Sequence, residues 1–289
     1  MLDVSAHVKA FEAYLKSLNR SFHTVKQYRI DANQFAAITK DSADLNEALQ
    51  RYTSEIQETY TSVNSINRKY AAIRQFLDFL QTRGEIGVYD SLLLQKLAKE
   101  QTALNVLTTK QLQLALNFWP HQFDIALNEE HAWLALRNTA ITYIIAELAI
   151  KPAELVRMQW KHVDDETNEL TVISSKSYRI LPLSKELFAL LERYKEHTHA
   201  FMPLTEHAPF VWLGVGNKLG EPIRVKTIER IFKAMSEQLC IKVTATNMRY
   251  QTILKEINES EDDQLFRQFG YARKWVLDER GQRFPKNNN

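Results

Sequence analysis

The sequence predicts a mainly helical protein with one small β-hairpin, divided into two domains. Apolar residues recur at helical spacing along most of the 289 residues, and only 7 residues are glycine. Two short β-like runs, residues 169–174 and 178–182, interrupt this helical pattern. A chain of this length is expected to form two domains, each large enough to bury its own core.

The first 85 residues predict a bundle of four helices. The first helix ends near Asn19, and either Ser21 or Thr24 caps the second. The third and fourth helices cover about residues 45–59 and 63–82, because apolar side chains recur there every three or four positions. Glycines follow the fourth helix and mark its end.

A connection of mixed character, residues 86–106, leads to a second domain at residues 107–289. Thr108 or Thr109 is expected to cap the first helix of this domain. Further along, the two β-like runs form a hairpin that carries Lys176 at its turn. The rest of the domain keeps the helical pattern.

Composition excludes several classes of protein. The net charge of +2 neither predicts nor excludes nucleic-acid binding, because phosphate contacts are local and depend on how the 37 Lys and Arg are distributed. No apolar run approaches the length of a membrane span, and the N-terminus begins an amphipathic segment rather than a signal peptide. Cys240 is the only cysteine, so no internal disulfide or thiolate zinc site can form. We expect a cytoplasmic protein with no metal, no cofactor and no membrane partner.

Three motifs of the second domain occur in a fixed order: Ala149-Ile150-Lys151-Pro152-Ala153-Glu154-Leu155, Thr246-Asn247-Met248-Arg249 and Phe269-Gly270-Tyr271. With Lys176 on the hairpin, their order and spacing resemble the tyrosine recombinase (phage integrase) family over nearly the whole chain. The resemblance implies a SAM-like, helical core-binding domain at residues 1–85, a linker at 86–106 and a recombinase catalytic-type domain at 107–289.

The reaction of that family explains which residue types its site needs. A tyrosine hydroxyl attacks a DNA phosphodiester and forms a covalent phosphotyrosyl link. The phosphate gains negative charge in the transition state, so fixed cations must face it, and the arginine fork fits phosphate oxygens best. A lysine and a histidine handle the protons of the leaving and attacking oxygens.

Carried over to this sequence, the resemblance implies a site with no intact catalytic set. Lys151 stands at the first arginine position, which keeps the charge and loses the fork. Lys176 matches the family lysine and Arg249 the second arginine, whereas Thr246 replaces the histidine. Tyr271 stands at the second His or Trp position. The nucleophile is expected about nine residues later, and residues 275–281 contain no tyrosine.

The resemblance also implies DNA contacts by cationic and polar side chains. In the first domain these are Lys26, Gln27, Arg29, Arg68, Lys69 and Arg74. In the second domain they are Lys151, Lys176, Arg224, Lys226 and Arg249. The alternative is that these residues form only the solvated faces of amphipathic helices.

We therefore predict a sequence-specific double-stranded DNA-binding protein whose two domains clamp the duplex and which has lost strand cleavage. Such a protein suits a transcription regulator or repressor of a phage or mobile element, located with the bacterial nucleoid. Members of the family exchange C-terminal segments, so a homo-oligomer on DNA is a further expectation, with residues 275–284 packing in cis or in trans. Two alternatives are an active recombinase or integrase that uses Tyr250 or Tyr271 as a displaced nucleophile, and a helical adaptor without DNA binding.

Overall fold

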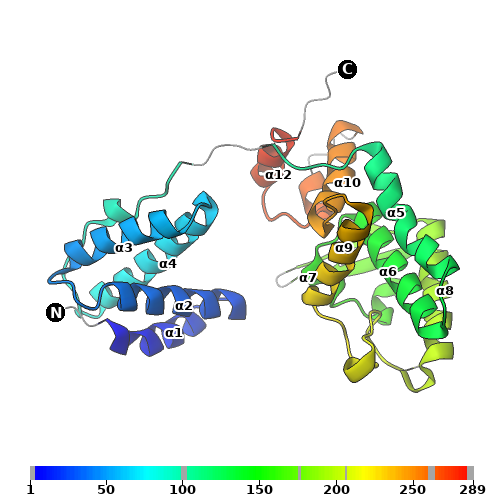
Figure 1. Ribbon diagram of the computed structural model, residues 1–289, viewed down its shortest axis with the longest axis horizontal. Coiled ribbons are helices and arrows are strands. Elements are labelled where there is room, and N and C mark those ends of the chain that lie inside the picture. The colour runs from blue at the N-terminus through cyan, green and yellow to red at the C-terminus, as the bar shows by residue number, and fades with distance from the viewer. Residues whose placement is uncertain (1–3, 99–102, 175–176, 206, 260–263, 285–289) are drawn as a thin grey trace. The chain divides into compact units, whose positions relative to one another are not determined.

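The computed structural model describes residues 4–98, 103–174, 177–205, 207–259 and 264–284. The chain divides into two compact units, residues 1–101 and 102–289. Figure 1 shows that the first unit is helical, whereas the second combines helices with a small sheet. The expected fold class, mainly α with a small β element, is confirmed.

Four helices build the first unit. They are α1 (Val8–Ser17), α2 (Phe22–Ile38), α3 (Leu45–Thr59) and α4 (Val63–Thr82), followed by the short 3-10 helix η2 (Ser91–Leu94). The side chain of Ser21 caps α2 by accepting a hydrogen bond from the Thr24 N–H at 3.1 Å, as its sequence position predicts. Ring contacts among buried aromatic residues fill the interior, including Phe11 with Phe76 at 5.0 Å and Phe35 with Tyr52 at 5.1 Å.

A buried charge cluster joins α2 to α4. Asp31 is fully buried, and the Lys69 ammonium lies 3.0 Å from its carboxylate. Arg68 donates to the same carboxylate, and Gln27 lies 3.4 Å from it. The surface position expected for Lys69 is therefore corrected, because only 3% of this residue is exposed. Burial of an ammonium group is costly unless a counter-ion lies beside it, and Asp31 supplies that counter-ion.

The second unit begins with α5 (Thr109–Asp124), for which Thr108 forms a capping box with Gln111. The chain continues through α6 (Glu129–Leu148), α7 (Pro152–Leu155), η3 (Trp160–His162), β1 (Val163–Asp164), β2 (Glu169–Ile173), β3 (Tyr178–Pro182) and α8 (Lys185–Phe201). After the short turns η4 (Pro203–Thr205) and η5 (Gly216–Lys218) come α9 (Val225–Leu239), α10 (Ala245–Glu259), α11 (Leu265–Gln268) and α12 (Lys274–Gly281).

The sheet is antiparallel with strand order β1-β2-β3. The register pairs Leu170 with Leu181, and both residues point into the core. The hairpin of β2 and β3 was predicted, whereas β1 was not. This strand has only 2 residues, which is too short for an alternating pattern to appear in the sequence.

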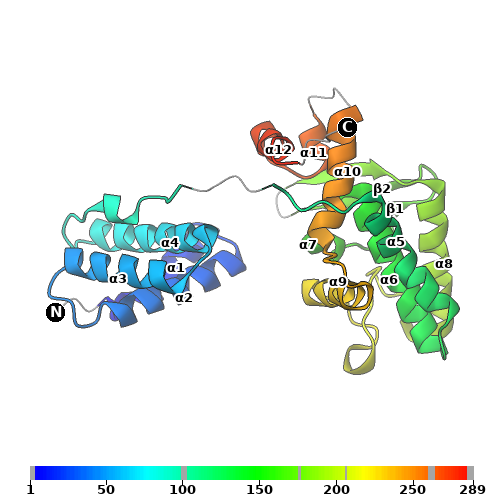
Figure 2. The same cartoon turned by 45° about the horizontal axis from the view of Figure 1, so that its top comes forward.

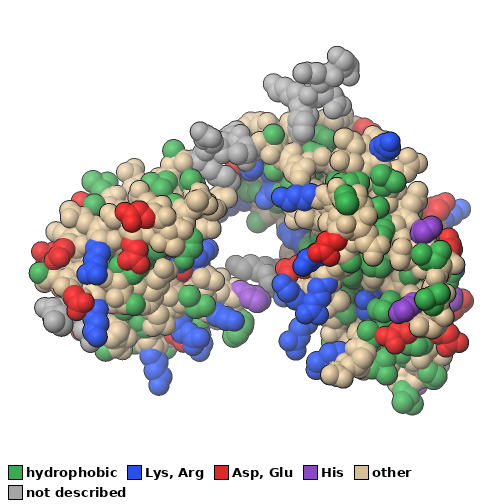
Figure 3. Space-filling model, in the orientation of Figure 1, with side chains coloured by type: hydrophobic (Ala, Val, Ile, Leu, Met, Phe, Trp, Pro, Cys, Tyr) green, Lys and Arg blue, Asp and Glu red, His purple; other side chains and the backbone are tan. Residues whose placement is uncertain are grey.

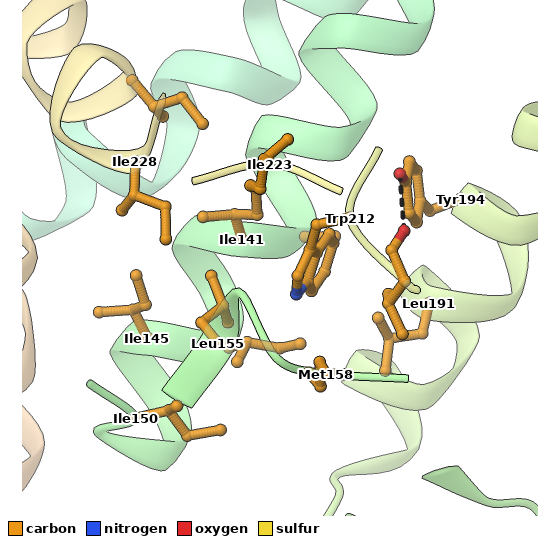
Figure 4. Close-up of a cluster of buried hydrophobic side chains, with 14 of the residues drawn as sticks. Ile141, Ile145, Ile150, Leu155, Met158, Leu191, Tyr194, Trp212, Ile223 and Ile228 are labelled. Atoms are coloured by element: carbon orange, nitrogen blue, oxygen red, sulfur yellow. Dashed lines mark hydrogen bonds between the residues drawn. The ribbon is translucent and has the colours of Figure 1, made fainter. Parts of the chain in front are cut away.

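Buried aliphatic and aromatic side chains from α6, α7, α8 and α9 form the main core of this unit. Figure 4 shows that Ile141, Ile145, Leu155 and Ile228 converge there, with Trp212 beside Tyr194. The Tyr194 hydroxyl donates to the Val211 carbonyl at 3.0 Å, so its polar end is satisfied inside the core. This core holds α7 and the sheet in a fixed position.

A second apolar cluster attaches the C-terminal helices. The views agree that α11 and α12 lie beside α10 (Figure 2). Leu277 and Phe284 pack with Tyr250, Ile253 and other buried residues of the same unit. In the single chain, the last described residues thus pack against their own unit. In the described parts of the chain, no helix combines the length and the apolar character needed to cross a membrane.

The buried cluster around Asp31 gives a test of the first unit's stability. Asp31→Ala leaves the Lys69 ammonium buried without its counter-ion, which should cost about 3–5 kcal/mol. All 5 tryptophans lie in the second unit, so tryptophan fluorescence follows only that unit during urea unfolding of the full chain. We expect Asp31→Ala to shift the far-ultraviolet ellipticity transition to lower urea and to leave the fluorescence transition unchanged.

Glu55→Ala removes an exposed carboxylate from α3 and is the matched control, with an expected change within about 0.5 kcal/mol. Equal transitions for the two variants would contradict a stabilising role for the buried cluster.

Candidate functional site

One buried carboxylate organises the surface where α7, β3 and the α11–α12 turn meet. The two terminal nitrogens of Arg179 donate to the two oxygens of Glu154, at 3.0 and 2.8 Å. The same carboxylate accepts the Lys151 backbone N–H at 3.0 Å. Burial raises the pKa of Glu154, but the hydrogen bonds and charges of Arg179 and Lys151 outweigh burial, and the net pKa is lowered. The carboxylate is therefore ionised at neutral pH, and the contribution of this network to stability is lost only as the pH falls through that lowered pKa.

The turn at Gly270 closes this network. Gly270 has φ +66°, and its carbonyl accepts a hydrogen bond from the Lys151 ammonium. A Cβ at this position would lie 3.0 Å from an Arg179 terminal nitrogen and 3.1 Å from a Glu154 oxygen. Arg179 Nε also donates to the Gln268 carbonyl at 2.8 Å, so α11 is fixed to β3. Glycine is required here both for backbone conformation and for the close approach of the turn.

A pocket of about 430 Å³ opens over these residues. Its walls come from α7, the β2–β3 hairpin and the segment around Gly270, and the lining residues are Lys151, Ser174, Ser177, Tyr178, Arg179, Phe266, Arg267, Gly270, Tyr271 and Ala272. Lys176 lies outside the described residues, in the hairpin turn between Ser174 and Ser177. Its place relative to the pocket stays a prediction.

Lys151 is half-buried at the edge of this pocket. Burial lowers the pKa of Lys151, the nearby arginines lower it further, and Glu154 opposes the shift. The Lys151 ammonium also lies 5.5 Å from the centre of the Tyr271 ring. This lysine therefore holds its proton less firmly than a solvent-exposed lysine does.

Arg249 and Arg280 lie behind Tyr271. Arg249 is 8% exposed, and its Nε donates to the Ala149 carbonyl at 2.6 Å. The Arg280 guanidinium lies 5.3 Å from the centre of the Tyr271 ring and donates to the Tyr250 hydroxyl. Burial raises the pKa of Tyr271, although the charges of Arg249 and Arg280 act in the opposite direction. The Tyr271 phenol is therefore protonated at neutral pH.

The structure brings together only some of the residues aligned with the family site. Lys151, Arg249 and Tyr271 meet around the pocket, because α7, α10 and the segment after α11 converge there. Thr246 lies exposed in the first turn of α10, in the position where the resemblance predicts a histidine in active enzymes. A hydroxyl of this kind cannot serve as a general acid or base near neutral pH.

Cationic side chains also cover the neighbouring surface. Lys and Arg gather along the flank of the second unit on which α12, α7 and α9 lie (Figure 3). Arg224 is exposed immediately before α9, and Lys226 is exposed in its first turn, 3.2 Å from Glu229. Because exposed pairs of this kind are weak, Lys226 can exchange Glu229 for another anion at little cost.

In the first unit, three of the six predicted contact residues meet at one hollow. Lys26, Gln27 and Arg68 line an open depression of about 550 Å³, together with His23, Thr24 and Tyr28. Arg29 is exposed nearby in the sequence and pairs with Glu12 at 3.2 Å. Arg74 instead donates to the Leu94 carbonyl and fixes η2. Arg74 and the buried Lys69 therefore have structural partners inside this unit.

Sequence reasoning missed the roles of three residues of the second unit. Glu154 stood inside a motif that carried the resemblance and Arg179 inside the predicted hairpin, but their pairing depends on the contact between α7 and β3, which local spacing does not show. Arg280 lies nine residues after Tyr271, within the segment searched for a tyrosine. Its distance from Tyr271 equals the distance at which the nucleophile is expected, so this spacing alone could have identified Arg280.

The fold is similar to that of solved integrases. A lambda integrase dimer bound to a COC′ core site has a TM-score of 0.74 at 14% identity, over 100% of this chain and 80% of that chain. The Tn1549 transposon integrase in complex with circular intermediate DNA has a TM-score of 0.63 at 13% identity, over 97% of this chain and 95% of that chain.

In sequence, the chain is similar to XerD-like tyrosine recombinases. The protein of Streptococcus mutans serotype c is 23% identical over 246 residues, which span 85% of this chain and 87% of that protein. The protein of Streptococcus agalactiae serotype Ia is 26% identical over 184 residues, or 63% of this chain and 67% of that protein. No model of a known protein family matches the chain. The resemblance to the tyrosine recombinases is thus confirmed in sequence and in fold.

Two glycines test how tightly the turn at Gly270 is built. Gly270→Ala puts a methyl group against Arg179 and Glu154, so it should break their ion pair and cost at least about 3 kcal/mol. Gly216→Ala is the matched control, because Gly216 has φ +61° and open space around it, and only the conformational cost of about 1–2 kcal/mol should remain. Urea unfolding followed by tryptophan fluorescence measures both. If Gly270→Ala is as stable as Gly216→Ala, the turn can move away from Arg179 and Glu154 without a loss of stability, and the prediction is wrong.

Proposed function

We propose that this protein binds double-stranded DNA and leaves both strands intact. The observation that carries the proposal is the pocket lined by Lys151 and Tyr271, behind which Arg249 lies, while Arg179 neutralises Glu154. Such a concentration of positive charge at the edge of a pocket suits a phosphate group, because guanidinium and ammonium groups bind phosphate through charge-assisted hydrogen bonds. Arg224 and Lys226, with Lys26 and Arg68 of the first unit, supply further contacts to the DNA backbone.

Strand cleavage needs groups that this pocket lacks among the described residues. Residues 275–281 contain no tyrosine, and no histidine follows His207 in the sequence. The phenol of Tyr271 is protonated, and Tyr250 is buried with its hydroxyl bonded to Arg280. The members of an active site act as a unit, so loss of the nucleophile together with a proton-transfer group removes most of the rate enhancement.

The relatives support the DNA-binding part of the proposal. The solved structures with this fold include a lambda integrase dimer bound to a core site and a lambda integrase tetramer bound to a Holliday junction. By analogy, we propose that this chain binds DNA as a homo-oligomer. A protein that keeps the binding surface and lacks cleavage suits a sequence-specific regulator, such as a repressor of a phage or mobile element.

Binding to DNA should depend steeply on salt. Six cations are proposed as phosphate contacts, namely Lys26, Arg68, Lys151, Arg224, Lys226 and Arg249. At about 0.9 counterions released for each contact, affinity for a duplex selected from a random pool should fall roughly 10³-fold between about 50 and about 200 mM salt. Gel-shift titrations at several salt concentrations measure this slope. Absence of any shifted duplex at low salt would instead indicate a helical adaptor.

A displaced nucleophile is the second candidate function, because Tyr271 lines the pocket beside the cations. A nicked suicide duplex, resolved on a denaturing gel after incubation, separates the two functions. The binding protein yields no covalent species. A covalent species that disappears in Tyr271→Phe or Tyr250→Phe would establish strand transfer and overturn the main proposal.

The pH dependence of binding tests the contact by Lys151. Lys151 is cationic below its pKa, and because this pKa is lowered, the charge is lost at a pH where an ordinary lysine keeps it. Wild-type affinity should therefore fall by up to about tenfold more than that of Lys151→Arg between about pH 7 and about pH 10, since arginine stays charged. Lys26→Arg, the same replacement at an exposed lysine, is the control. Parallel pH profiles for wild type and Lys151→Arg would exclude a phosphate contact by Lys151.

A further inference from the structure

Polar atoms without partners gather on the inner side of the pocket. Arg249 Nη2, Tyr271 Oη and Arg280 Nε are all buried and form no hydrogen bond of good geometry among the described residues, although Arg249 lies close enough to interact with the Tyr271 hydroxyl. The three side chains are neighbours, because the charges of Arg249 and Arg280 both act to lower the pKa of Tyr271, and the Arg280 guanidinium lies over the Tyr271 ring. Buried donors are normally satisfied, so a cluster of unsatisfied ones indicates a site for a group that accepts hydrogen bonds.

Arg280 is the unexpected member of this cluster. It comes from the last turns of α12, and its guanidinium lies between the Tyr271 ring at 5.3 Å and the Tyr250 ring at 5.7 Å. One terminal nitrogen donates to the Tyr250 hydroxyl, which fixes the plane of the guanidinium. No carboxylate of the described residues forms an ion pair with Arg249 or Arg280, because the nearby Glu154 is held by the fork of Arg179.

A purely structural role explains this arrangement poorly. Contacts with two aromatic rings favour a cation, but a guanidinium whose Nε–H is buried without a partner carries a desolvation cost. Arg280 also lies close enough to Lys151 to lower the pKa of the lysine, so like charges have been brought together. An anion bound between them would remove both costs.

We propose that Arg280 binds a phosphate of intact DNA, holding a non-bridging oxygen through its free Nε–H together with Arg249 and Lys151. This inference rests on the proposed function and names one phosphate-binding residue of that site. The ligand class is a phosphodiester, because a single negative charge with two free oxygens suits two guanidinium groups and an ammonium that approach from different elements. The step is binding alone, and no bond of the phosphate is broken.

The test uses the full chain and a duplex selected from a random pool by the wild-type protein. Affinity and its salt dependence are measured for wild type, Arg280→Gln, Arg280→Lys and the control Arg193→Gln, which removes an exposed arginine of α8. Arg280→Gln should bind about tenfold or more weakly and should lower the salt slope by about one contact. Arg280→Lys keeps the charge and loses the fork, so it should keep the slope and part of the affinity.

A second measurement separates contact from support. Each phosphate of the duplex is replaced in turn by a neutral methylphosphonate. At one position, the replacement should weaken binding by wild type strongly and should weaken binding by Arg280→Gln much less. If Arg280 has only a structural role, Arg280→Gln should bind more weakly than wild type by the same factor at every replaced phosphate, and this result would overturn the inference. If Arg280→Gln does not fold, as judged by its tryptophan fluorescence and ellipticity, Arg280→Ala, which also removes the charge, takes its place in this comparison.

The outcomes also distinguish the two proposals. If wild type binds no duplex, the proposed function fails, and the inference fails with it. If wild type binds and Arg280→Gln matches it in affinity and salt slope, only the assignment of Arg280 is wrong.

Discussion

The bidentate ion pair between Arg179 and Glu154 is the constraint on which the rest of the pocket depends. It joins a four-residue helix, α7, to strand β3, and neither element is long enough to fix its own orientation. Because the pair is buried and both oxygens are satisfied, breaking it would leave an uncompensated charge at a cost of about 3–5 kcal/mol. The position of Lys151, one turn before Glu154, follows from this pair.

Backbone carbonyls hold the remaining cations. Arg249 donates to the Ala149 carbonyl, and Lys151 donates to the Gly270 carbonyl. Ala149 has φ +48°, an unfavourable conformation for alanine that allows the chain to turn sharply between α6 and α7 and to present this carbonyl to α10. A carbonyl orients a cation without cancelling its charge. Glu154 is held by the fork of Arg179 and lies 4.0 Å from the Lys151 ammonium, and no carboxylate of the described residues forms an ion pair with Arg249.

Much of the fold could be predicted from the sequence, because helices 45–59 and 63–82 and the hairpin leave periodic patterns over many residues. The two-residue strand β1 leaves no such pattern. In the site, the positions of Lys151, Arg249 and Tyr271 could be predicted because motif spacing records them. The pairing of Glu154 with Arg179 and the burial of Lys69 beside Asp31 could not, since both depend on contacts between distant elements. Lys69 was assigned to DNA or to solvent because it is a cation, and no role was predicted for Glu154. Only the tertiary contacts show the partners of these residues.

The near-zero net charge of the chain fits a local binding site better than a broadly cationic surface. With 37 basic and 35 acidic residues, attraction to DNA depends on where acidic partners are absent or already paired. The pocket around Tyr271 meets this condition, because its carboxylate is neutralised by Arg179. In a cleaving enzyme, cations around a phosphate act mainly in the transition state, where the charge on the phosphate is highest. Under the proposed function no such state is reached, and the same cations contribute to binding of the intact phosphodiester. Interactions that would stabilise a transition state in a cleaving enzyme then contribute to affinity for DNA, and Arg280 would add to that affinity through its contact with the same phosphate.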